Sequence, residues 1–467
     1  MMIMQKRGGY ISGIFLAAML CMSGEGLFAQ DFFRELGTSR TSGGLGPVMP
    51  SEYNLHQGEP SGMHRVTPLS PDEENSKYNV AIGPVRMSIA AGVGLEWNDN
   101  VFYSEHDRES DFVLRPLLNL DLFWPTGDSN ALRLTIGASY AKYFDHPELD
   151  SSSVIFSPNS VLAFSFDVGN LKFTVRDRFS YQEDPYAVAP LSNVARYQRY
   201  ENQAGIEMEW PINEKLTFTA GYDHYNLWSA DDIFSSEDHS IDTIFIRPSY
   251  QLTPGMKVGL FASDSIISFK DSDRADSNGI MVGPFIDVQL TDVISLYLEV
   301  GYQGLNFDGT SNFDDDFFVR SNSDFFNSLN PDERELFTDS SDSNSYYVKF
   351  ELSHHPSDIF EHGISFTKTA EIGFGSNFYD LYHVEYGATF RGIDKTELTG
   401  ILFYEFYDTS GDFSEKANRF GASVGIRHHF TDSIALGLDY RFLLKDSNIE
   451  GADFYQNLVF LSVYYRF

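Results

Sequence analysis

Apolar and polar residues alternate along most of the chain from Val85 to its last residue, Phe467. The clearest stretch has Ile, Leu, Leu, Val and Tyr at the even positions of 294–302, with Ser, Tyr, Glu and Gly between them. Stretches 132–140 and 434–442 repeat the pattern. Because successive side chains of a β-strand point to opposite faces, this period of two predicts strands with one apolar and one polar face. Many stretches run near or beyond ten residues, a length suited to a tilted bilayer crossing.

The final stretch, 455–467, has one face that is wholly apolar or aromatic. The residues of that face are Phe467, Tyr465, Val463, Leu461 and Val459. A soluble domain rarely ends on such a strand because free termini fray, although the closing strand of a soluble β-sandwich is the alternative. A barrel in a membrane must pair every edge, since unpaired backbone groups would face lipid. The aromatic end resembles the terminal signature that the assembly machinery of bacterial outer-membrane barrels recognises, which marks Tyr465 and Phe467 as a candidate assembly signal.

Short and long connections alternate between the expected strands. The short turns fall at 125–130, 168–170, 211–214, 253–255, 291–292, 356–361, 392–394 and 431–432. The other links, most of them longer, fall at 98–109, 145–151, 183–199, 229–239, 270–276, 308–342, 375–379, 408–417 and 445–453. Outer-membrane barrels have this arrangement, with turns in the periplasm and loops outside. We therefore expect an all-β fold, a transmembrane antiparallel up-and-down β-barrel of about 18 strands, over residues 81–467.

Two features complicate the strand count. Stretch 257–269 alternates poorly, which leaves about 16 strands as the alternative. Four prolines fall inside expected strands, where each would remove a hydrogen bond from the ladder. They are Pro116, Pro158, Pro248 and Pro284. We expect bulges or shifted strand ends at these positions.

The segment before the barrel has no strand pattern. Lys6 and Arg7, an apolar stretch at 11–22 and a cleavage site after Ala29 predict a signal peptide over residues 1–29. Residues 30–80 are rich in Gly, Ser and Pro, which is typical of a disordered periplasmic tail. Threading of this tail into the barrel as a plug is the alternative. We expect export to the bacterial outer membrane.

The composition fits a barrel and excludes one kind of partner. Hydrophobic residues make up 42% and aromatic residues 15% of the 467 residues, as expected where half of each strand faces lipid and half faces water. The net charge of −34 argues against nucleic acid. Acidic outer loops would bind anionic lipopolysaccharide through divalent cations. The expected partners are the lipid bilayer, lipopolysaccharide and the barrel assembly machinery, with a homo-oligomer left open.

No sequence feature predicts an enzyme, a cofactor or a metal site. The single cysteine, Cys21, lies in the expected signal peptide, so the mature chain has no thiol. A Walker loop and a dinucleotide fingerprint are both missing from the sequence. In the pairs His354-His355 and His428-His429, neighbouring side chains point to opposite strand faces, so neither pair can chelate a metal as a unit.

A short motif resembles a known family. Residues 95–102 read LEWNDNVF, and Ser110, Asp111 and Phe112 follow. This pattern, near the start of the first strand, resembles the β-barrel porin family of largely uncharacterised bacterial outer-membrane proteins, and the resemblance extends over residues 85–467. It implies a barrel and a channel. Some relatives are associated with exopolysaccharide secretion, which gives an alternative function.

Strand alternation assigns charged side chains of both signs to the inside of the barrel. The expected pore-lining residues are Arg133, Lys172, Arg176, Arg178, Glu207, Glu209, Glu299, Lys349, Glu351, Glu385, Arg391, Arg427, Asp439 and Arg441. A basic residue that faced lipid at mid-bilayer would cost on the order of 2–4 kcal/mol, which favours the inward assignment. A closed interior of salt bridges is the alternative to a water-filled pore. So many strands leave a lumen too wide for side chains to fill, which favours the pore.

The longest expected loop, 308–342, is the candidate constriction. Asn330 and Pro331, followed by two acidic residues, predict the start of a short helix that would pack inside the wall. The candidate constriction residues are Asp314, Asp315, Asp316, Glu333, Leu336 and Phe337. A solvated outer flap is the alternative. The acidic run lacks the spacing and the glycine of a calcium loop, which favours plain surface charge.

These patterns together predict an outer-membrane channel for passive diffusion of small solutes. The acidic balance predicts a mild preference for cations. A barrel component of an exopolysaccharide export or assembly system is the main alternative, and an outer-membrane hydrolase is a third possibility.

Overall fold

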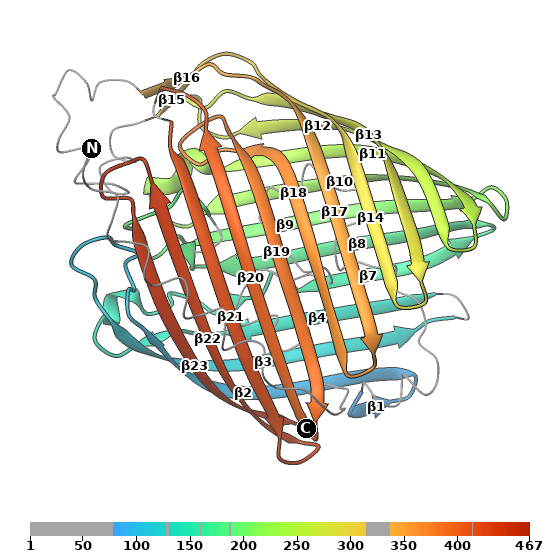
Figure 1. Cartoon of the computed structure of the whole chain (residues 1–467), viewed down its shortest axis with the longest axis horizontal. Helices are drawn as coiled ribbons and strands as arrows, with labels where there is room; N and C mark the ends of the chain where they lie inside the picture. Colours follow the sequence, from blue (N-terminus) through green and yellow to red (C-terminus); the bar gives the residue numbers. More distant parts are fainter. Residues whose placement is uncertain (1–77, 128–129, 159, 186–187, 314–336, 413) are drawn as a thin grey trace.

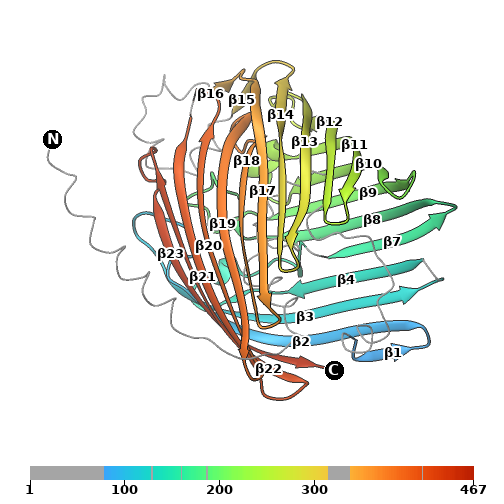
Figure 2. The same ribbon diagram turned by 45° about the vertical axis from the view of Figure 1, so that its right-hand side comes forward.

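The computed structural model describes residues 78–127, 130–158, 160–185, 188–313, 337–412 and 414–467. These residues form a closed antiparallel barrel of 18 strands (Figures 1 and 2). The wall strands are β2 (Val85–Asn98), β3 (Asp111–Pro125), β4 (Ala131–Ser139), β7 (Val161–Val168), β8 (Leu171–Gln182), β9 (Arg199–Pro211), β10 (Leu216–Ser229), β11 (His239–Thr253), β12 (Met256–Phe269), β13 (Ser277–Thr291), β14 (Ile294–Phe307), β17 (Ser343–Ser357), β18 (Phe360–Ile372), β19 (Phe378–Ile393), β20 (Thr396–Thr409), β21 (Lys416–His429), β22 (Ile434–Ser447) and β23 (Phe454–Arg466). β23 pairs with β2 and closes the wall. The expected all-β barrel of about 18 strands is confirmed, and the alternative of 16 is wrong.

Short strands and 3-10 helices lie toward the two ends of the barrel. They are the strands β1 (Val80–Ile82), β5 (Lys142–Tyr143), β6 (Ile155–Phe156), β15 (Ser311–Phe313) and β16 (Phe337–Asp339), with the 3-10 helices η2 (Pro147–Leu149) and η4 (Asp232–Glu237). β15 and β16 lie at the end that carries the long loops, and the C terminus lies at the opposite, short-turn end (Figures 1 and 2). Within the described part of the chain, no helix has the length and apolar character needed to cross a membrane.

Wall strands present apolar side chains outward and more polar side chains inward. On β22, Leu438 and Tyr440 are exposed, whereas Arg441 and Lys445 are buried on the other face. At the end of β23, Tyr465 and Phe467 expose 48% and 59% of their surface. The role of Tyr465 and Phe467 as an assembly signal stays a prediction.

β12 shows why stretch 257–269 alternates poorly. Its inward face carries Phe261 and Ile267, which are fully buried in an apolar cluster inside the barrel. Its outward face carries the exposed Asp264. Each face therefore mixes apolar and polar residues, although the strand pairs with both β11 and β13.

The prolines inside the wall are accommodated without bulges. Pro116, Pro248 and Pro284 lie within β3, β11 and β13. On one side, Pro248 pairs with Phe218 of β10. On the other side, the pairing of β11 with β12 is interrupted at Pro248 and continues beyond it in the same register. The ladder between β13 and β14 skips Pro284 in the same way. The expected bulges or shifted ends are wrong here, because the missing N–H affects only the local rungs. Pro158 lies between β6 and β7, outside the strands.

The wall has a gap in its ladder between β17 and β18, near the long-loop end. Pairing stops at Val348 and Lys368, although both strands continue toward that end. Gln303 of β14 instead donates a hydrogen bond to the Ala370 carbonyl (2.7 Å) and accepts one from the Ala370 N–H (2.8 Å). The last residues of β18 therefore lie against the inward side of β14.

Aromatic rings lie against glycines on the inner wall. A Cβ atom at Gly92 would lie 2.6 Å from the Tyr464 ring, and one at Gly221 would lie 2.5 Å from the Phe245 ring. Only glycine leaves room for a ring at such positions. The rings at these positions therefore lie along the wall.

Candidate functional site in the barrel lumen

The expected pore-lining residues lie in wall strands, at the positions that alternate with the outward apolar side chains. They are Arg133 on β4; Lys172, Arg176 and Arg178 on β8; Glu207 and Glu209 on β9; Glu299 on β14; Lys349 and Glu351 on β17; Glu385 and Arg391 on β19; Arg427 on β21; and Asp439 and Arg441 on β22. Some of them pair with one another, with 3.6 Å between Lys172 and Glu209 and 3.7 Å between Lys349 and Glu351. Their role in lining an open pore stays a prediction.

Other members of this set bind partners that sequence reasoning missed. Arg176 donates to both carboxylate oxygens of Asp223 on β10, at 2.7 and 2.8 Å. Arg391 contacts Glu361 at 2.8 Å and Glu397 at 3.0 Å. These partners lie at inward positions of nearby strands, so alternation placed them on the correct face. The strand register, which alternation does not give, decides which charges meet.

Two further ion pairs show the same organisation. Arg247 of β11 donates to Glu299 at 3.0 Å. On β20, Glu405 binds Arg419 at 2.7 Å and His383 at 3.0 Å. Charges of opposite sign therefore compensate one another along much of the inner wall, which is the condition for burying them.

A loop between β8 and β9 crosses the lumen. We call residues 183–198 the crossing loop, of which 183–185 and 188–198 are described. Its residues Leu191 and Tyr197 are buried, and it contacts β20 and β22. From β8 to β20 the wall passes through β7, β4, β3, β2, β23, β22 and β21 in one direction, and from β9 through β10 to β19 in the other. β20 therefore lies across the barrel, and this segment, expected as one of the longer links, packs against the inner face of the opposite wall.

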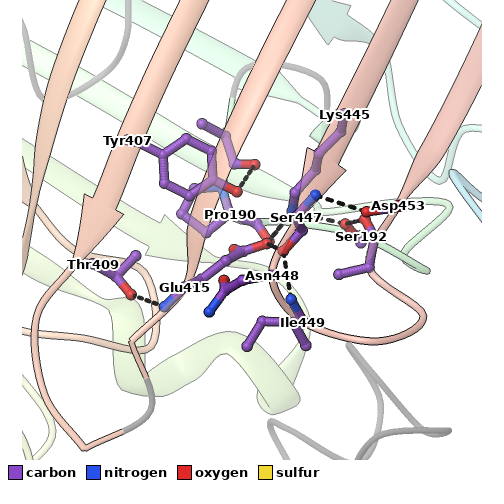
Figure 3. Close-up of polar contacts among 12 residues, drawn as sticks. Pro190, Ser192, Tyr407, Thr409, Glu415, Lys445, Ser447, Asn448, Ile449 and Asp453 are labelled. Atoms are coloured by element: carbon purple, nitrogen blue, oxygen red, sulfur yellow. Dashed lines mark hydrogen bonds and ion pairs between the residues drawn. The ribbon is translucent and has the colours of Figure 1, made fainter. Parts of the chain in front are cut away.

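Lys445 on β22 is the main anchor of the crossing loop (Figure 3). Its ammonium group donates to the Pro190 carbonyl at 3.0 Å and to the Ser192 hydroxyl at 2.8 Å. The Tyr407 hydroxyl on β20 donates to the Ala189 carbonyl at 3.1 Å. Both anchors are fully buried side chains of the wall, so the loop is held by rigid strands.

Glu415 balances the charge of this anchor. Its carboxylate lies 3.0 Å from the Lys445 ammonium group and accepts a 2.6 Å hydrogen bond from the Ser447 hydroxyl. The Glu415 N–H donates to the Thr409 hydroxyl at 2.7 Å (Figure 3). A buried ammonium group needs such a partner, because its desolvation is otherwise too costly.

The crossing loop is also bound by the connections that follow β2 and β22. The Asn193 side chain donates to the Gly451 carbonyl at 2.8 Å, and the Asn193 N–H donates to the Tyr103 carbonyl at 3.1 Å. The Tyr103 hydroxyl donates to Asp184 at 2.7 Å. Burial chiefly raises the pKa of Tyr103 well above its ordinary value, and the nearby Asp184 carboxylate raises it further. Tyr103 therefore stays a neutral hydrogen-bond donor.

Apolar contacts join the crossing loop to other loops at the barrel mouth. The Tyr197 ring lies 4.9 Å from the Phe234 ring and 5.3 Å from the Phe374 ring, between centroids. Leu191 and Phe313 belong to the same buried cluster. Segments that follow β8, β10, β14 and β18 therefore pack together across the long-loop end.

A buried ion pair between Arg274 and Glu237 holds together the segments that follow β10 and β18. Arg274 donates to Glu237 of η4 at 2.7 Å, and the Gly375 N–H donates to the same carboxylate oxygen at 3.1 Å. Burial raises the pKa of Glu237, and the Arg274 guanidinium opposes that rise. Arg274 also donates to the backbone carbonyls of Gly373 and Ser376, so one arginine joins the loops after β12 and β18 to η4.

A cavity of about 230 Å³ lies next to the base of the crossing loop. Its charged lining includes Arg115, Asp184, Arg196, Arg427, Asp439 and Arg441. One carboxylate oxygen of Asp439 is buried without a hydrogen-bond partner among the described residues. Three of the expected pore-lining residues, Arg427, Asp439 and Arg441, thus meet in one hollow that can offer both donors and acceptors to a polar solute.

The candidate constriction residues of loop 308–342 cannot be placed. Asp314, Asp315, Asp316, Glu333 and Leu336 lie outside the described residues, and Phe337 begins β16 with a side chain that is not described. The hairpin of β15 and β16 at the base of this loop packs over the mouth, where the Asn377 N–H donates to Asp339 at 2.8 Å. The role of the candidate residues as a constriction stays a prediction.

The apolar residues Leu191, Val194 and Tyr197 are the signal that could have identified the crossing loop, because an otherwise polar outer segment needs no such residues. Among the described residues, no group of three or more His, Cys, Asp or Glu side chains is arranged to hold a metal ion.

No family model matches this chain, and no curated protein matches it. Similar solved structures include OpdK of Pseudomonas aeruginosa with vanillate, with a TM-score of 0.44, 10% identity and coverage of 82% of this chain and 99% of that chain. OccK2 (OpdF) of the same species, in complex with glucuronate, has a TM-score of 0.45, 11% identity and coverage of 82% and 98%. OccAB3 of Acinetobacter baumannii has a TM-score of 0.43, 9% identity and coverage of 82% and 99%.

The 18-strand barrel is consistent with the β-barrel porin family that the sequence resembles. The vanillate and the glucuronate belong to those proteins, and nothing about the solute of this chain follows from them.

Proposed function

We propose that this chain is a bacterial outer-membrane channel for the passive diffusion of small solutes. The observation that carries the proposal is the crossing loop, which binds β20 and β22 across a charged lumen and borders a polar cavity. A barrel of this many strands has an interior too wide for wall side chains alone to fill. A loop bound to the opposite wall suits small solutes better than a polysaccharide chain.

The outer wall supports a place in a bilayer. Exposed Leu, Ile and Val side chains cover it, and outward-facing tyrosines donate to Asn or Asp near the long-loop end of the next strand. These pairs are Tyr222 with Asp242, Tyr302 with Asn344, Tyr404 with Asn418 and Tyr440 with Asn457, at 2.5–2.7 Å. Aromatic residues with a polar tip mark the interfaces of outer-membrane barrels. We place the long loops outside the cell and the short turns in the periplasm, with Tyr465 and Phe467 read by the assembly machinery.

The charge balance supports a mild preference for cations. The net charge of −34 raises the local concentration of cations at the mouth, whereas the mixed charges of the inner wall keep the preference modest. Acidic loops would also contact lipopolysaccharide through divalent cations. The signal peptide over 1–29 and the periplasmic tail over 30–80 belong to the same proposal.

Liposome swelling tests the proposal. Vesicles that contain the folded protein should swell quickly in small neutral sugars and progressively more slowly in larger ones. A reversal potential measured across a KCl gradient should have the sign of cation selectivity. Exclusion of every sugar, whatever its size, would identify a plugged barrel and contradict the channel.

A further inference from the structure

Two histidines from adjacent strands meet on the outer wall near its short-turn end. His354 of β17 and His362 of β18 are direct partners in the ladder, and His354 Nδ1 lies 2.9 Å from His362 Nε2. The sequence neighbour His355 lies on the other face of β17, where it is 3.3 Å from Glu361. The pairing of β17 with β18 therefore brings together two histidines that are eight residues apart in the sequence.

The spacing of these two nitrogens fits a shared metal ion. Imidazole nitrogens bind zinc and similar metals at about 2.0–2.1 Å, so two such ligands at a right angle lie about 2.9 Å apart. As a hydrogen bond, the pair needs one protonated and one free nitrogen. A divalent cation would replace that proton and bind both imidazoles in their neutral form.

Neighbouring side chains already orient the pair. The Tyr386 hydroxyl lies 3.3 Å from His362 Nδ1, the nitrogen that does not face His354. The Phe360 ring stacks on the His362 imidazole with 5.1 Å between centroids. Histidine ligands of metals usually make a hydrogen bond through their second nitrogen, because it fixes the orientation of the ring. Both histidines also lie on paired strands, so the backbone needs no rearrangement.

We propose that His354 and His362 form a binding site for a divalent transition-metal ion, with Cu²⁺ favoured over Ni²⁺ and Zn²⁺. Both side chains are half-buried and lie close to the turn between β17 and β18, so water can supply the remaining ligands. Two imidazoles and water suit the square-planar geometry of Cu²⁺, which also heads the affinity order of these metals. The ion would join β17 to β18 at the end of the wall opposite the gap in their ladder.

Electron paramagnetic resonance of the purified, untagged chain from residue 30, with one equivalent of Cu²⁺, tests this site. We expect an axial spectrum with hyperfine coupling to two nitrogens, and loss of that spectrum in His354→Gln and in His362→Gln. His355→Gln is the matched control and should keep the spectrum, because this side chain lies on the opposite face. Heat-modifiable electrophoretic mobility shows whether each variant has folded.

The variant Tyr386→Phe keeps both ligands and removes the orienting hydroxyl, so its affinity for Cu²⁺ should fall by about tenfold or more. A wild-type spectrum without coupling to two nitrogens would overturn the proposal and leave a hydrogen-bonded histidine pair. A spectrum that is unchanged in folded His354→Gln would overturn it as well.

Discussion

Lys445 is fully buried on the inner wall, where its ammonium group lies 3.0 Å from Glu415 and binds the crossing loop. Removing one member of a buried ion pair typically costs about 3–5 kcal/mol, because the other charge stays buried without compensation. Lys416, nearby on β21, is 2.7 Å from Asp408, but the two side chains of that pair are 57% and 33% exposed, and such surface pairs contribute little. At the scale of single residues, burial therefore decides how much an ion pair contributes to the free energy of unfolding.

Lys445→Met should lower the free energy of unfolding by about 3 kcal/mol. The substitution leaves the Glu415 carboxylate without its opposite charge and removes the two hydrogen bonds of Lys445 to the crossing loop. Urea titration of the barrel in lipid vesicles measures this change. Lys416→Met is the control and should change the free energy by less than about 1 kcal/mol. Equal effects of the two substitutions would contradict the anchoring role of Lys445.

His146 should make the packing of loop 99–110 depend on pH. Its Nε2 lies 2.7 Å from Glu109 and its Nδ1 3.0 Å from Asp111, and the hydrogen bond with Glu109 chiefly raises the pKa of His146. The protonated imidazole stabilises this contact fully below the ordinary pKa of about 6.5, and the stabilisation is lost as pH rises through the raised value. Hydrogen exchange, corrected for intrinsic rates, should show more protection of 99–110 at pH 5.5 than at pH 8.5. His146→Gln should remove this pH dependence, and a wild-type protein without it would refute the argument.

At the scale of elements, the end of β18 is the part of the wall that departs most from a regular barrel. Its ladder with β17 stops at Lys368, whose side chain is buried and 2.7 Å from Asp380 on β19. Beyond that point the Gln303 side chain makes the hydrogen bonds to Ala370 that a neighbouring strand would make. A single glutamine amide therefore substitutes for a rung of the sheet.

Gln303→Ala should make the Ala370 amide exchange about fivefold faster or more, because a buried N–H without its acceptor costs at least about 1 kcal/mol. Hydrogen exchange with peptide or residue resolution measures the rate. Gln251→Ala is the control, since that side chain bonds the Thr253 carbonyl at an exposed turn, and it should leave Ala370 unchanged. An Ala370 amide that is unaffected by Gln303→Ala would show that another group satisfies it.

At the scale of the whole molecule, the alternation of residues together with that of short and long connections was enough to predict the barrel and its strand count. The crossing loop was not predictable in the same way, because it is held by contacts of Ser192 with Lys445 and of Ala189 with Tyr407. Those contacts join opposite walls and exist only once the barrel has closed. The same holds for His354 and His362, which strand register alone brings together. Most of the candidate constriction residues of loop 308–342 lie outside the described residues, so that constriction stays a prediction.

Single-channel recording in a planar bilayer tests the central claim most directly. The purified protein, shown to be folded by its heat-modifiable mobility, should insert and give discrete, stable conductance steps in KCl, because water and ions fill the lumen beside the crossing loop. Folded protein that inserts repeatedly and gives no steps would contradict the account, since the same walls and loops would then form a closed cylinder.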